Sequence, residues 1–165
     1  MTVGPTWEAP AVGTRWTAER LRRTLQQNIS SGRLIVVSNR EPCVHDLDAA
    51  GAIVARRPVS GLVSALDPIL LATGGTWIAH GSGAADRATV DMRDRVRIAA
   101  DDGSYTLRRV WLTRGEERGY YHGFANSGLW PLCHVAFEPP RFTRNDWRHY
   151  QEVNRRFADA VVAEA

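Results

Sequence analysis

The sequence has little cysteine, two residues in 165, and it contains no long apolar run. Cys43 and Cys133 are far apart, so they do not form a disulfide framework, and both are expected to be reduced thiols. No stretch approaches the roughly 20 apolar residues of a membrane span. The first ten residues lack a basic start followed by an apolar segment, which argues against a signal peptide. We therefore expect a cytoplasmic protein without a membrane partner.

Patterns for metal and nucleic-acid binding are absent as well. The five histidines show no HxxxH spacing and neither cysteine belongs to a CxxC pair, so no structural metal and no cofactor are predicted. The 21 basic residues are arginines, and they do not cluster with aromatic residues, which argues against nucleic acid. At a net charge of +3, most of them are expected to be solvated, although a guanidinium group also suits the phosphate of a small anion.

The first 32 residues are predicted to be an extension of the main domain. Residues 1–16 contain glycine and proline with little periodicity, and we expect them to be mobile. Thr17 can cap a short helix that reaches Ile29, before a Ser-Ser-Gly sequence breaks it. Residues 33–165 then form one partial domain of ordinary size.

The first half of this domain predicts a βαβ unit. Residues 34–37 are an apolar, β-branched run typical of a strand buried on both faces. Ser60 begins a helix with apolar residues at helical spacing, Gly74-Gly75 ends it, and residues 76–79 form a second buried strand. Thr143 is expected to cap a last helix. This order predicts a doubly wound, Rossmann-like α/β fold.

The remaining segments are less regular. Within the polar loop 41–58, residues 52–56 are expected to pair as a short strand. Residues 90–98 and 105–112 alternate around an Asp-Asp-Gly turn, which predicts a pair of antiparallel strands. The aromatic and glycine-bearing segment 120–130 is predicted to be a loop with a short helix.

Two polar segments follow the pattern of ligand sites in open α/β sheets, which lie beyond the carboxyl ends of the strands. Arg40 follows the first strand, where its guanidinium can bind a phosphate with two hydrogen bonds. Alternatively, it caps the strand or pairs with Glu41. Ser60 and Gly61 begin a helix, whose free N–H groups and dipole favour an anion such as a diphosphate. The alternative is a plain N-cap serine beside a glycine required for packing.

Residues 120–131 form a third candidate segment, in which aromatic side chains alternate with glycine and polar residues. Aromatic rings stack on the apolar faces of sugars, while Tyr hydroxyl and Asn amide groups satisfy sugar hydroxyls. The alternative is a loop anchored by aromatic packing, a role that we expect of Phe124. Three aspartates near turns are interpreted as solvated or capping residues, namely Asp86, Asp91 and Asp94.

A fixed order of motifs runs through the domain. The motifs are LIVVSNR ending at Arg40, SGLVSAL from Ser60, GTWI at 75–78, YYHGFAN and LWP within 120–131, then Trp147, Tyr150, Val153-Asn154 and Phe157-Ala-Asp159. As a set they resemble the trehalose-6-phosphate synthase family, which are retaining sugar-nucleotide glycosyltransferases of the family 20 type. The resemblance covers residues 33–165 and leaves residues 1–32 outside it.

The resemblance implies the N-terminal lobe of a two-lobed, GT-B type enzyme. Such an enzyme moves glucose with retention from UDP-glucose to glucose 6-phosphate, giving trehalose 6-phosphate. The resemblance implies that Arg40 and Tyr121 bind the acceptor phosphate and that Trp130 lies beside the acceptor sugar and selects its α-anomer. It also implies that Ser60 and Gly61 approach the donor diphosphate. UDP-glucose is a substrate, so no metal or other cofactor is implied.

The chain departs from the family pattern in two ways. Many members have Trp-Ser-Gly after the second strand, whereas here His80 precedes Gly-Ser-Gly and is expected at or beside the place of that acceptor-facing tryptophan. The chain also stops before the C-terminal lobe, so alone it is expected to be inactive, and to self-associate or require that lobe as its partner. Two alternatives stay open: a related (pseudo)glycosyltransferase with another sugar or polyol phosphate acceptor, and a non-catalytic sugar-phosphate-binding lobe.

Overall fold

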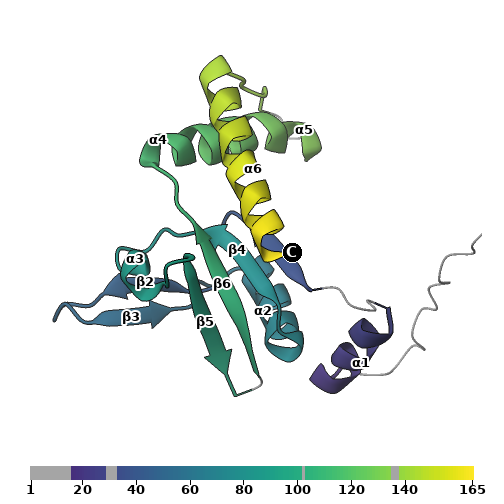
Figure 1. Cartoon of the computed structure of the whole chain (residues 1–165). Coiled ribbons are helices and arrows are strands. Elements are labelled where there is room, and N and C mark those ends of the chain that lie inside the picture. The colour runs from purple at the N-terminus through teal and green to yellow at the C-terminus, as the bar shows by residue number, and fades with distance from the viewer. Residues whose placement is uncertain (1–15, 29–32, 102, 135–137) are drawn as a thin grey trace, which may run out of the picture.

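The computed structural model describes residues 16–28, 33–101, 103–134 and 138–165. A four-stranded sheet lies between helix α2 on one face and helix α6 on the other, and a long helical segment crosses above one end of the sheet (Figure 1). The elements in chain order are α1 (Ala18–Asn28), β1 (Ile35–Ser38), β2 (Val44–Leu47), β3 (Ile53–Arg56), α2 (Gly61–Thr73), β4 (Thr76–His80), α3 (Asp86–Thr89), β5 (Arg95–Ala100), β6 (Gly103–Val110), α4 (Arg114–Glu117), η1 (Arg118–Leu129), α5 (Trp130–Cys133) and α6 (Arg144–Glu164).

The sheet has the strand order β1-β4-β6-β5. Strands β1, β4 and β6 are parallel, and β5 is antiparallel to β6. The predicted β1–α2–β4 unit and the predicted antiparallel pair are both confirmed. Strand β6 is also a third parallel strand, which the sequence pattern did not indicate. Because parallel strands share one direction, their carboxyl ends lie at a single edge, the edge that faces α4, η1 and α5 in Figure 1.

The two strands of the βαβ unit differ in burial. Every residue of β4 is buried, and Trp77 and Ile78 belong to the cores on opposite faces of the sheet. The prediction that β1 is buried on both faces is met only in part, because none of its four residues is fully buried and Val37 is 48% exposed. Ile35 and Val36 still pack against the two cores, so the apolar run contributes to both faces.

The polar segment after β1 contains a hairpin of two strands, β2 and β3, where the sequence predicted one short strand. Strand β3 is the one predicted. The carboxylate of Asp48 closes the turn, because its Oδ1 accepts hydrogen bonds from the N–H groups of Ala50 and Ala52, both at 2.9 Å. Gly51 in this turn has a φ of 78°, a conformation that favours glycine. The hairpin projects beyond the β5 side of the sheet (Figure 1).

Helix α2 begins and ends where the sequence predicts. The Ser60 Oγ accepts a hydrogen bond from the N–H of Val63 at 3.1 Å, and Gly74 follows the last turn with a φ of 76°. Val63 and Leu70 pack against the face of the sheet that carries Trp77. Since β4 starts directly after the C-terminus of α2, the N-terminus of α2 lies toward the carboxyl ends of the parallel strands.

Residues 114–133 form one continuous helical segment, so the prediction of a loop with a short helix is wrong. Thr113 and Glu116 form a capping box at its start, and its middle, η1, is a π-helix. Glycines let α6 approach closely: a Cβ on Gly123 would lie 2.6 Å from the Asp146 carboxyl carbon. Phe124 anchors the segment as predicted, with its ring centroid 4.6 Å from that of Tyr150 and 5.0 Å from that of Trp147.

The outer helices follow the sequence prediction. Thr143 caps α6, whose buried residues Val153 and Phe157 pack with Ile78 on the second face of the sheet. Helix α1 begins after Thr17 and packs against α2. The mobility predicted for residues 1–15 and the break predicted near residue 30 lie outside the described residues. Both cysteines are free, as predicted.

Candidate functional site

Five of the elements bring the sequence-predicted residues to one side of the molecule. Arg40 follows β1, Ser60 and Gly61 start α2, and His80 ends β4, all toward the carboxyl edge of the sheet. The other two predicted residues lie on the helical segment that crosses above this edge (Figure 1), Tyr121 on η1 and Trp130 at the start of α5. A backbone hydrogen bond joins two of these places: the His80 N–H donates to the Asn39 carbonyl at 3.2 Å, beside Arg40.

Arg40 has an exposed side chain on a fixed backbone. The Ser38 hydroxyl donates to the Arg40 carbonyl at 2.6 Å, and the Trp77 indole N–H donates to the Ser38 Oγ at 2.8 Å. The alternative in which Arg40 pairs with Glu41 is wrong, because Glu41 is 3% exposed and pairs with Arg109. Within the described part of the chain, the Arg40 guanidinium has no ion-pair partner and remains available to an anion.

The start of α2 has a side-chain cap, and its first backbone N–H groups remain accessible. Ser60 is the N-cap, as its hydrogen bond from Val63 shows. A Cβ built on Gly61 would meet no heavy atom within 4 Å, and its φ is not in the left-handed region. Neither packing against the described residues nor backbone conformation therefore requires glycine at this position. The missing side chain instead leaves the first N–H groups of the helix accessible, as a bound anion would need.

His80 has a defined tautomer because of its neighbours. The ring is buried, and its Nδ1 lies 3.1 Å from the Val110 carbonyl oxygen. A carbonyl oxygen only accepts, so Nδ1 carries the hydrogen and donates it. Nε2 faces Glu117 of α4, with 4.0 Å between Nε2 and Oε2. The neutral ring thus offers an acceptor at Nε2, and protonation would give an ion pair with Glu117.

The two aromatic candidates differ in exposure. Tyr121 is half-buried, with its ring edge-on to His122 at a centroid distance of 5.2 Å. Trp130 is 56% exposed and stacks on His134, with ring centroids 3.4 Å apart. An exposed indole is suited to stacking on a sugar face, and a half-buried phenol can present its hydroxyl to a polar group. Among the described residues, no hydrogen bond or ring contact joins either side chain to Arg40 or His80.

Beneath the carboxyl edge lies a buried ionic cluster that sequence reasoning missed. Arg109 of β6 is 1% exposed and donates from Nε to Glu41 at 2.9 Å, while its NH2 lies 2.7 Å from Asp86 Oδ1. The same guanidinium also donates to the carbonyl of Cys43 at 3.0 Å and to Thr89 Oγ1 at 2.9 Å. The interpretation of Asp86 as a solvated or capping residue is therefore wrong in its first part, since Asp86 is fully buried.

Within this cluster, Glu41 is the acid whose pKa is shifted. Burial, and after it the neighbouring Asp86, raise the pKa of Glu41 to about 7, against the lowering effects of Ser82 and Arg109. Glu41 Oε1 accepts from the N–H of Ser82 at 2.8 Å and from its hydroxyl at 3.0 Å. Ser82 lies between two glycines, and that Gly-Ser-Gly sequence is the one signal in the chain that pointed to a crowded turn here.

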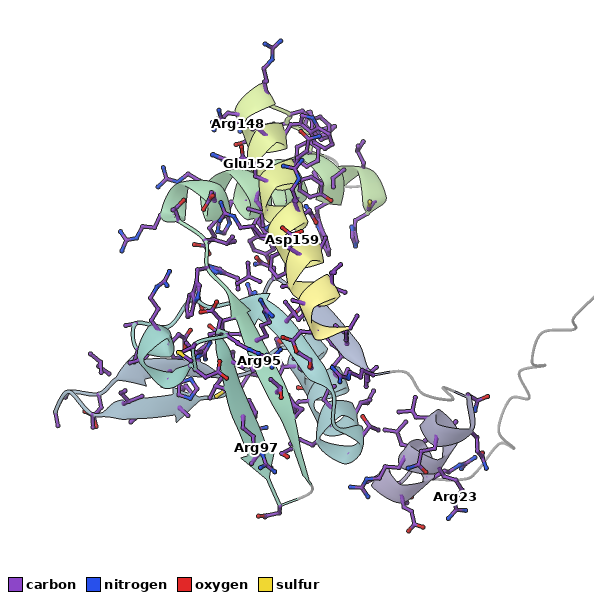
Figure 2. The ribbon with its side chains drawn as sticks, viewed as in Figure 1. Arg23, Arg95, Arg97, Arg148, Glu152 and Asp159 are labelled. Carbon is purple, nitrogen blue, oxygen red and sulfur yellow. The ribbon has the colours of Figure 1, made fainter. Side chains whose placement is uncertain are left out.

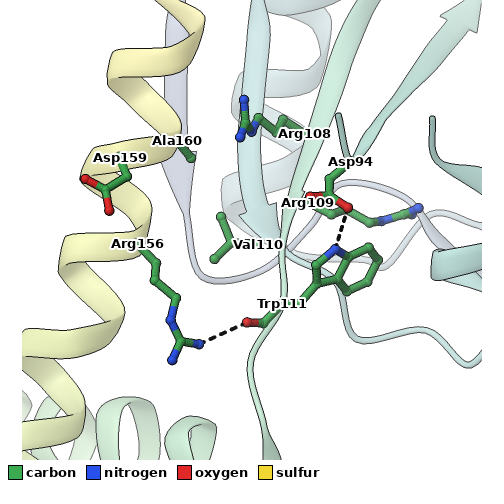
Figure 3. A pocket seen from close by; sticks show the side chains of 8 residues that line it. All are labelled: Asp94, Arg108, Arg109, Val110, Trp111, Arg156, Asp159 and Ala160. Atoms are coloured by element: carbon green, nitrogen blue, oxygen red, sulfur yellow. Dashed lines mark hydrogen bonds between the residues drawn. The ribbon is translucent and has the colours of Figure 1, made fainter. Parts of the chain in front are cut away.

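A separate groove of about 340 Å³ lies between the end of β6 and α6 (Figure 3). None of the six predicted site residues lines it. Its arginines already have partners: Arg156 donates to the Trp111 carbonyl at 3.2 Å and pairs with Glu116, and Arg108 pairs with Glu164. We therefore do not assign the candidate site to this groove.

Two kinds of feature are absent from the described residues. No group of three or more His, Cys, Asp or Glu side chains there could hold a metal ion. None of the helices found in the same residues is long and apolar enough to cross a membrane.

Comparisons with known proteins follow the same division of the chain. The model of the family described as glycosyltransferase family 20 matches residues 32–165. The chain is 37% identical over 131 residues to the trehalose-6-phosphate synthase of Mycobacterium ulcerans, which covers 79% of this chain and 25% of that relative. It thus spans about a quarter of the length of such relatives.

Two solved structures show the same partial match. An α,α-trehalose-phosphate synthase (UDP-forming) from Burkholderia xenovorans in complex with glucose-6-phosphate is 25% identical, with a TM-score of 0.53 over 80% of this chain and 26% of that one. An E. coli trehalose-6-phosphate structure bound with UDP-2-fluoro glucose is 26% identical, with a TM-score of 0.52 over 80% of this chain and 25% of that one. The α/β fold is the predicted Rossmann-like N-terminal lobe of a GT-B enzyme, and the chain belongs to glycosyltransferase family 20.

Proposed function

We propose that this chain is the acceptor-binding lobe of a trehalose-6-phosphate synthase. The reaction would move glucose, with retention, from UDP-glucose to glucose 6-phosphate. One observation carries the proposal: an exposed, unpaired Arg40 stands beside His80 at the carboxyl edge of the sheet, in a family 20 chain. The relatives named above are trehalose-phosphate synthases, and the two solved structures are bound with glucose-6-phosphate and UDP-2-fluoro glucose.

In this proposal Arg40 and Tyr121 hold the acceptor phosphate. A guanidinium binds a phosphate dianion with two parallel, charge-assisted hydrogen bonds, and the exposed side chain of Arg40 is not occupied by another acid. The Tyr121 hydroxyl would add a neutral donor. Fixing the acceptor at its phosphate leaves the reacting sugar hydroxyl in one position, which is how binding contributes to the rate of a two-substrate reaction.

Ser60 and Gly61 would approach the donor diphosphate. The open start of α2 offers backbone N–H groups and the positive end of the helix dipole, and both become more favourable as the leaving diphosphate gains charge. Departure of UDP is the step that needs this stabilisation. The uridine contacts would belong to a C-terminal lobe, which is the partner that we propose for this chain, with self-association as the alternative.

Trp130 and His80 would contact the acceptor sugar. The exposed indole suits a sugar face, and its position would favour the α-anomer. His80 offers hydrogen bonding where an indole would stack, and Glu117 beside it strengthens that polar character. This polar pair is the observation that keeps a second candidate open, a related transferase whose acceptor is another sugar or polyol phosphate. We propose no metal or other cofactor, and a cytoplasmic location.

The test is a chimeric enzyme in which this chain replaces the matching quarter of the Mycobacterium ulcerans relative. Arg40→Ala should weaken acceptor binding about tenfold to a hundredfold, by the loss of roughly 1.5–3 kcal/mol from a charged hydrogen-bonded pair. Arg40→Lys should restore only part of this, because an ammonium group keeps the charge and loses the fork. KM for glucose 6-phosphate and for UDP-glucose would be measured separately.

A matched control is Arg97→Ala. Arg97 is also exposed, bonds to the Ser104 hydroxyl, and lies on β5 toward the end of the sheet away from the helical segment (Figure 2). It should leave both KM values unchanged. Equal losses for both substrates on Arg40→Ala would indicate a structural arginine, and no loss for either would remove Arg40 from the site. The unmodified chain alone should give no turnover.

A further inference from the structure

The backbone around Arg40 is fixed from both sides. On one side, Ser38 donates to the Arg40 carbonyl and is itself held by Trp77. On the other side, Glu41 is almost completely buried, and its carboxylate bonds to Arg109. Because this backbone is already fixed, only the side-chain torsions of Arg40 remain to be ordered when an anion binds.

Arg109 joins the loop after β1 to the loop after β4. Its Nε–H donates to Glu41 at 2.9 Å, and Glu41 in turn accepts two hydrogen bonds from Ser82 at 2.8 and 3.0 Å. Glu41 directly follows Arg40, and Ser82 lies two residues after His80. One buried arginine therefore connects the two segments that carry the neighbouring candidate residues.

The glycines around Ser82 have no room for a side chain. A Cβ on Gly81 would lie 2.5 Å from the Trp111 ring and 3.0 Å from Arg109 Cδ, and a Cβ on Gly83 would overlap the His45 carbonyl and lie 2.8 Å from Asp86 Oδ1. Packing against Trp111, the His45 carbonyl and the buried cluster therefore requires glycine on both sides of Ser82.

We propose that Glu41 and Arg109 are positioning residues, which fix Arg40 and His80 for the acceptor phosphate. This inference rests on the acceptor-binding function proposed above. Neither side chain can touch the acceptor, since Glu41 is 3% exposed and Arg109 is 1% exposed. They act by limiting the orientations of the two loops before the ligand arrives, which reduces the conformational entropy lost on binding.

The sharpest substitution is Glu41→Gln. It keeps the size of the side chain but turns one acceptor oxygen into a donor, which then faces the N–H donors of Arg109 or Ser82. The affinity of the 165-residue chain for glucose 6-phosphate and for inorganic phosphate should fall about fivefold to tenfold. In an Arg40→Ala background the same substitution should change affinity by less than about twofold, because the residue through which it acts is missing.

Asp67→Asn is the matched control. Asp67 is also a buried acid that bonds to an arginine, Arg57, but it lies on α2 and accepts a hydrogen bond from Tyr105 of β6. Its replacement should lower the melting temperature and leave the affinity for both probes unchanged. A loss of affinity that merely follows a loss of stability would therefore appear in this control as well.

The experiment is an NMR titration of the wild type, Glu41→Gln, Arg40→Ala, their double variant and Asp67→Asn, with a thermal melt of each. Unchanged affinity in a folded Glu41→Gln protein overturns the inference, as does the same loss in both Arg40 backgrounds. If Glu41→Gln does not fold, Ser82→Ala repeats the test at an exposed position, with an expected loss of about twofold to threefold. A wild type that binds neither probe would instead reject the acceptor-binding function itself.

Discussion

Two buried networks in this lobe each join a carboxylate to an arginine, and they differ in what surrounds the charges. At the carboxyl edge, the side chains of Arg109 and Asp86 are both 0% exposed, and Glu41 is 1% exposed. Under α2, Asp67 accepts a hydrogen bond from Tyr105 at 2.6 Å and pairs with Arg57, whose side chain is 42% exposed. The first network joins loops, and the second joins a helix to a strand and to the end of the hairpin.

Solvent access determines how much stability each network loses when its arginine is removed. If Arg57 is removed, solvent can reach Asp67 and replace part of the lost interaction. If Arg109 is removed, two carboxylates remain buried without a cation, and water has no access to either. The comparison therefore predicts that the same kind of substitution is costly in the first network and tolerated in the second.

The largest effect is expected for Arg109→Met. Removing one partner of a buried ionic cluster costs about 3–5 kcal/mol of unfolding free energy, because the remaining charges are left uncompensated. Arg57→Met in the exposed network should cost less than about 1 kcal/mol. Urea denaturation of both variants measures the difference, and similar losses would contradict the distinction between the two networks.

The second effect is a pH dependence that only the first network should show. Because the pKa of Glu41 is raised to about 7 by burial and by Asp86, the folded chain holds this proton more tightly than the unfolded chain does. Stability should thus fall as the pH rises from about 4.5 to about 7, by up to roughly 3 kcal/mol at ~1.36 kcal/mol per pKa unit.

The measurement is the unfolding free energy of the wild type minus that of Glu41→Gln, at pH 5 and at pH 8. His45 lies 3.5 Å from Asp86, and because it is present in both proteins its contribution cancels in the difference. The difference should shrink on going to pH 8. A difference that is constant with pH would mean that Glu41 is ionised throughout and that Arg109 offsets the effect of burial.

A third effect tests how tightly the first network is enclosed. On Gly83→Ala, the new methyl would overlap the His45 carbonyl and lie 2.7 Å from Val44 Cγ1, so the loop must move and about 1–3 kcal/mol should be lost. Gly61→Ala is the control, since its methyl would meet nothing within 4 Å, and its stability should be unchanged or slightly higher. Thermal melts of the two variants should separate clearly, and equal melting temperatures would argue against a crowded turn.

Apart from the controls Arg57→Met and Gly61→Ala, the smallest effect is expected for Tyr105→Phe in the second network. The substitution removes one hydrogen bond to Asp67, which keeps Arg57 as its partner, so about 1–2 kcal/mol should be lost. Burial and Asp67 both raise the pKa of Tyr105, so its hydroxyl stays protonated in the folded chain. Urea denaturation again measures the change, and a loss as large as that of Arg109→Met would reverse the order proposed here.

The sequence pattern predicted those strands and helix ends that a few neighbouring residues specify. The apolar run before Arg40, the Ser60 cap and the paired glycines after α2 each specify a strand, a helix start or a helix end within a few residues. Residues 114–133 were harder, because glycines and aromatic rings usually indicate loops, whereas here the glycines serve the close approach of α6. That purpose depends on a helix 20 to 30 residues further along the chain.

The candidate site was harder still to predict from the sequence. Arg40, Ser60 and Gly61 could be proposed from their places after a strand and before a helix, and His80 only from the resemblance to the family pattern; their roles remain predictions. The ionic cluster could not be found in this way. Glu41 and Arg109 are 68 positions apart, and each reads as a surface charge until the fold pairs them in the interior.

The burial of Arg109 also restricts how this corner of the protein can change over time. A single substitution of Arg109 leaves the carboxylates of Glu41 and Asp86 buried without their cation. A single substitution of Glu41 leaves hydrogen-bond donors of Arg109 and Ser82 without an acceptor. A protein in which only one of these residues has been exchanged is therefore less fit than a protein in which all or none have been exchanged. Glu41, Asp86 and Arg109 should thus be replaced together or retained together. Arg40, which is exposed beside them, is free of that constraint only while the buried support stays intact. New acceptor preferences should thus arise first at the exposed positions, on an unchanged buried frame.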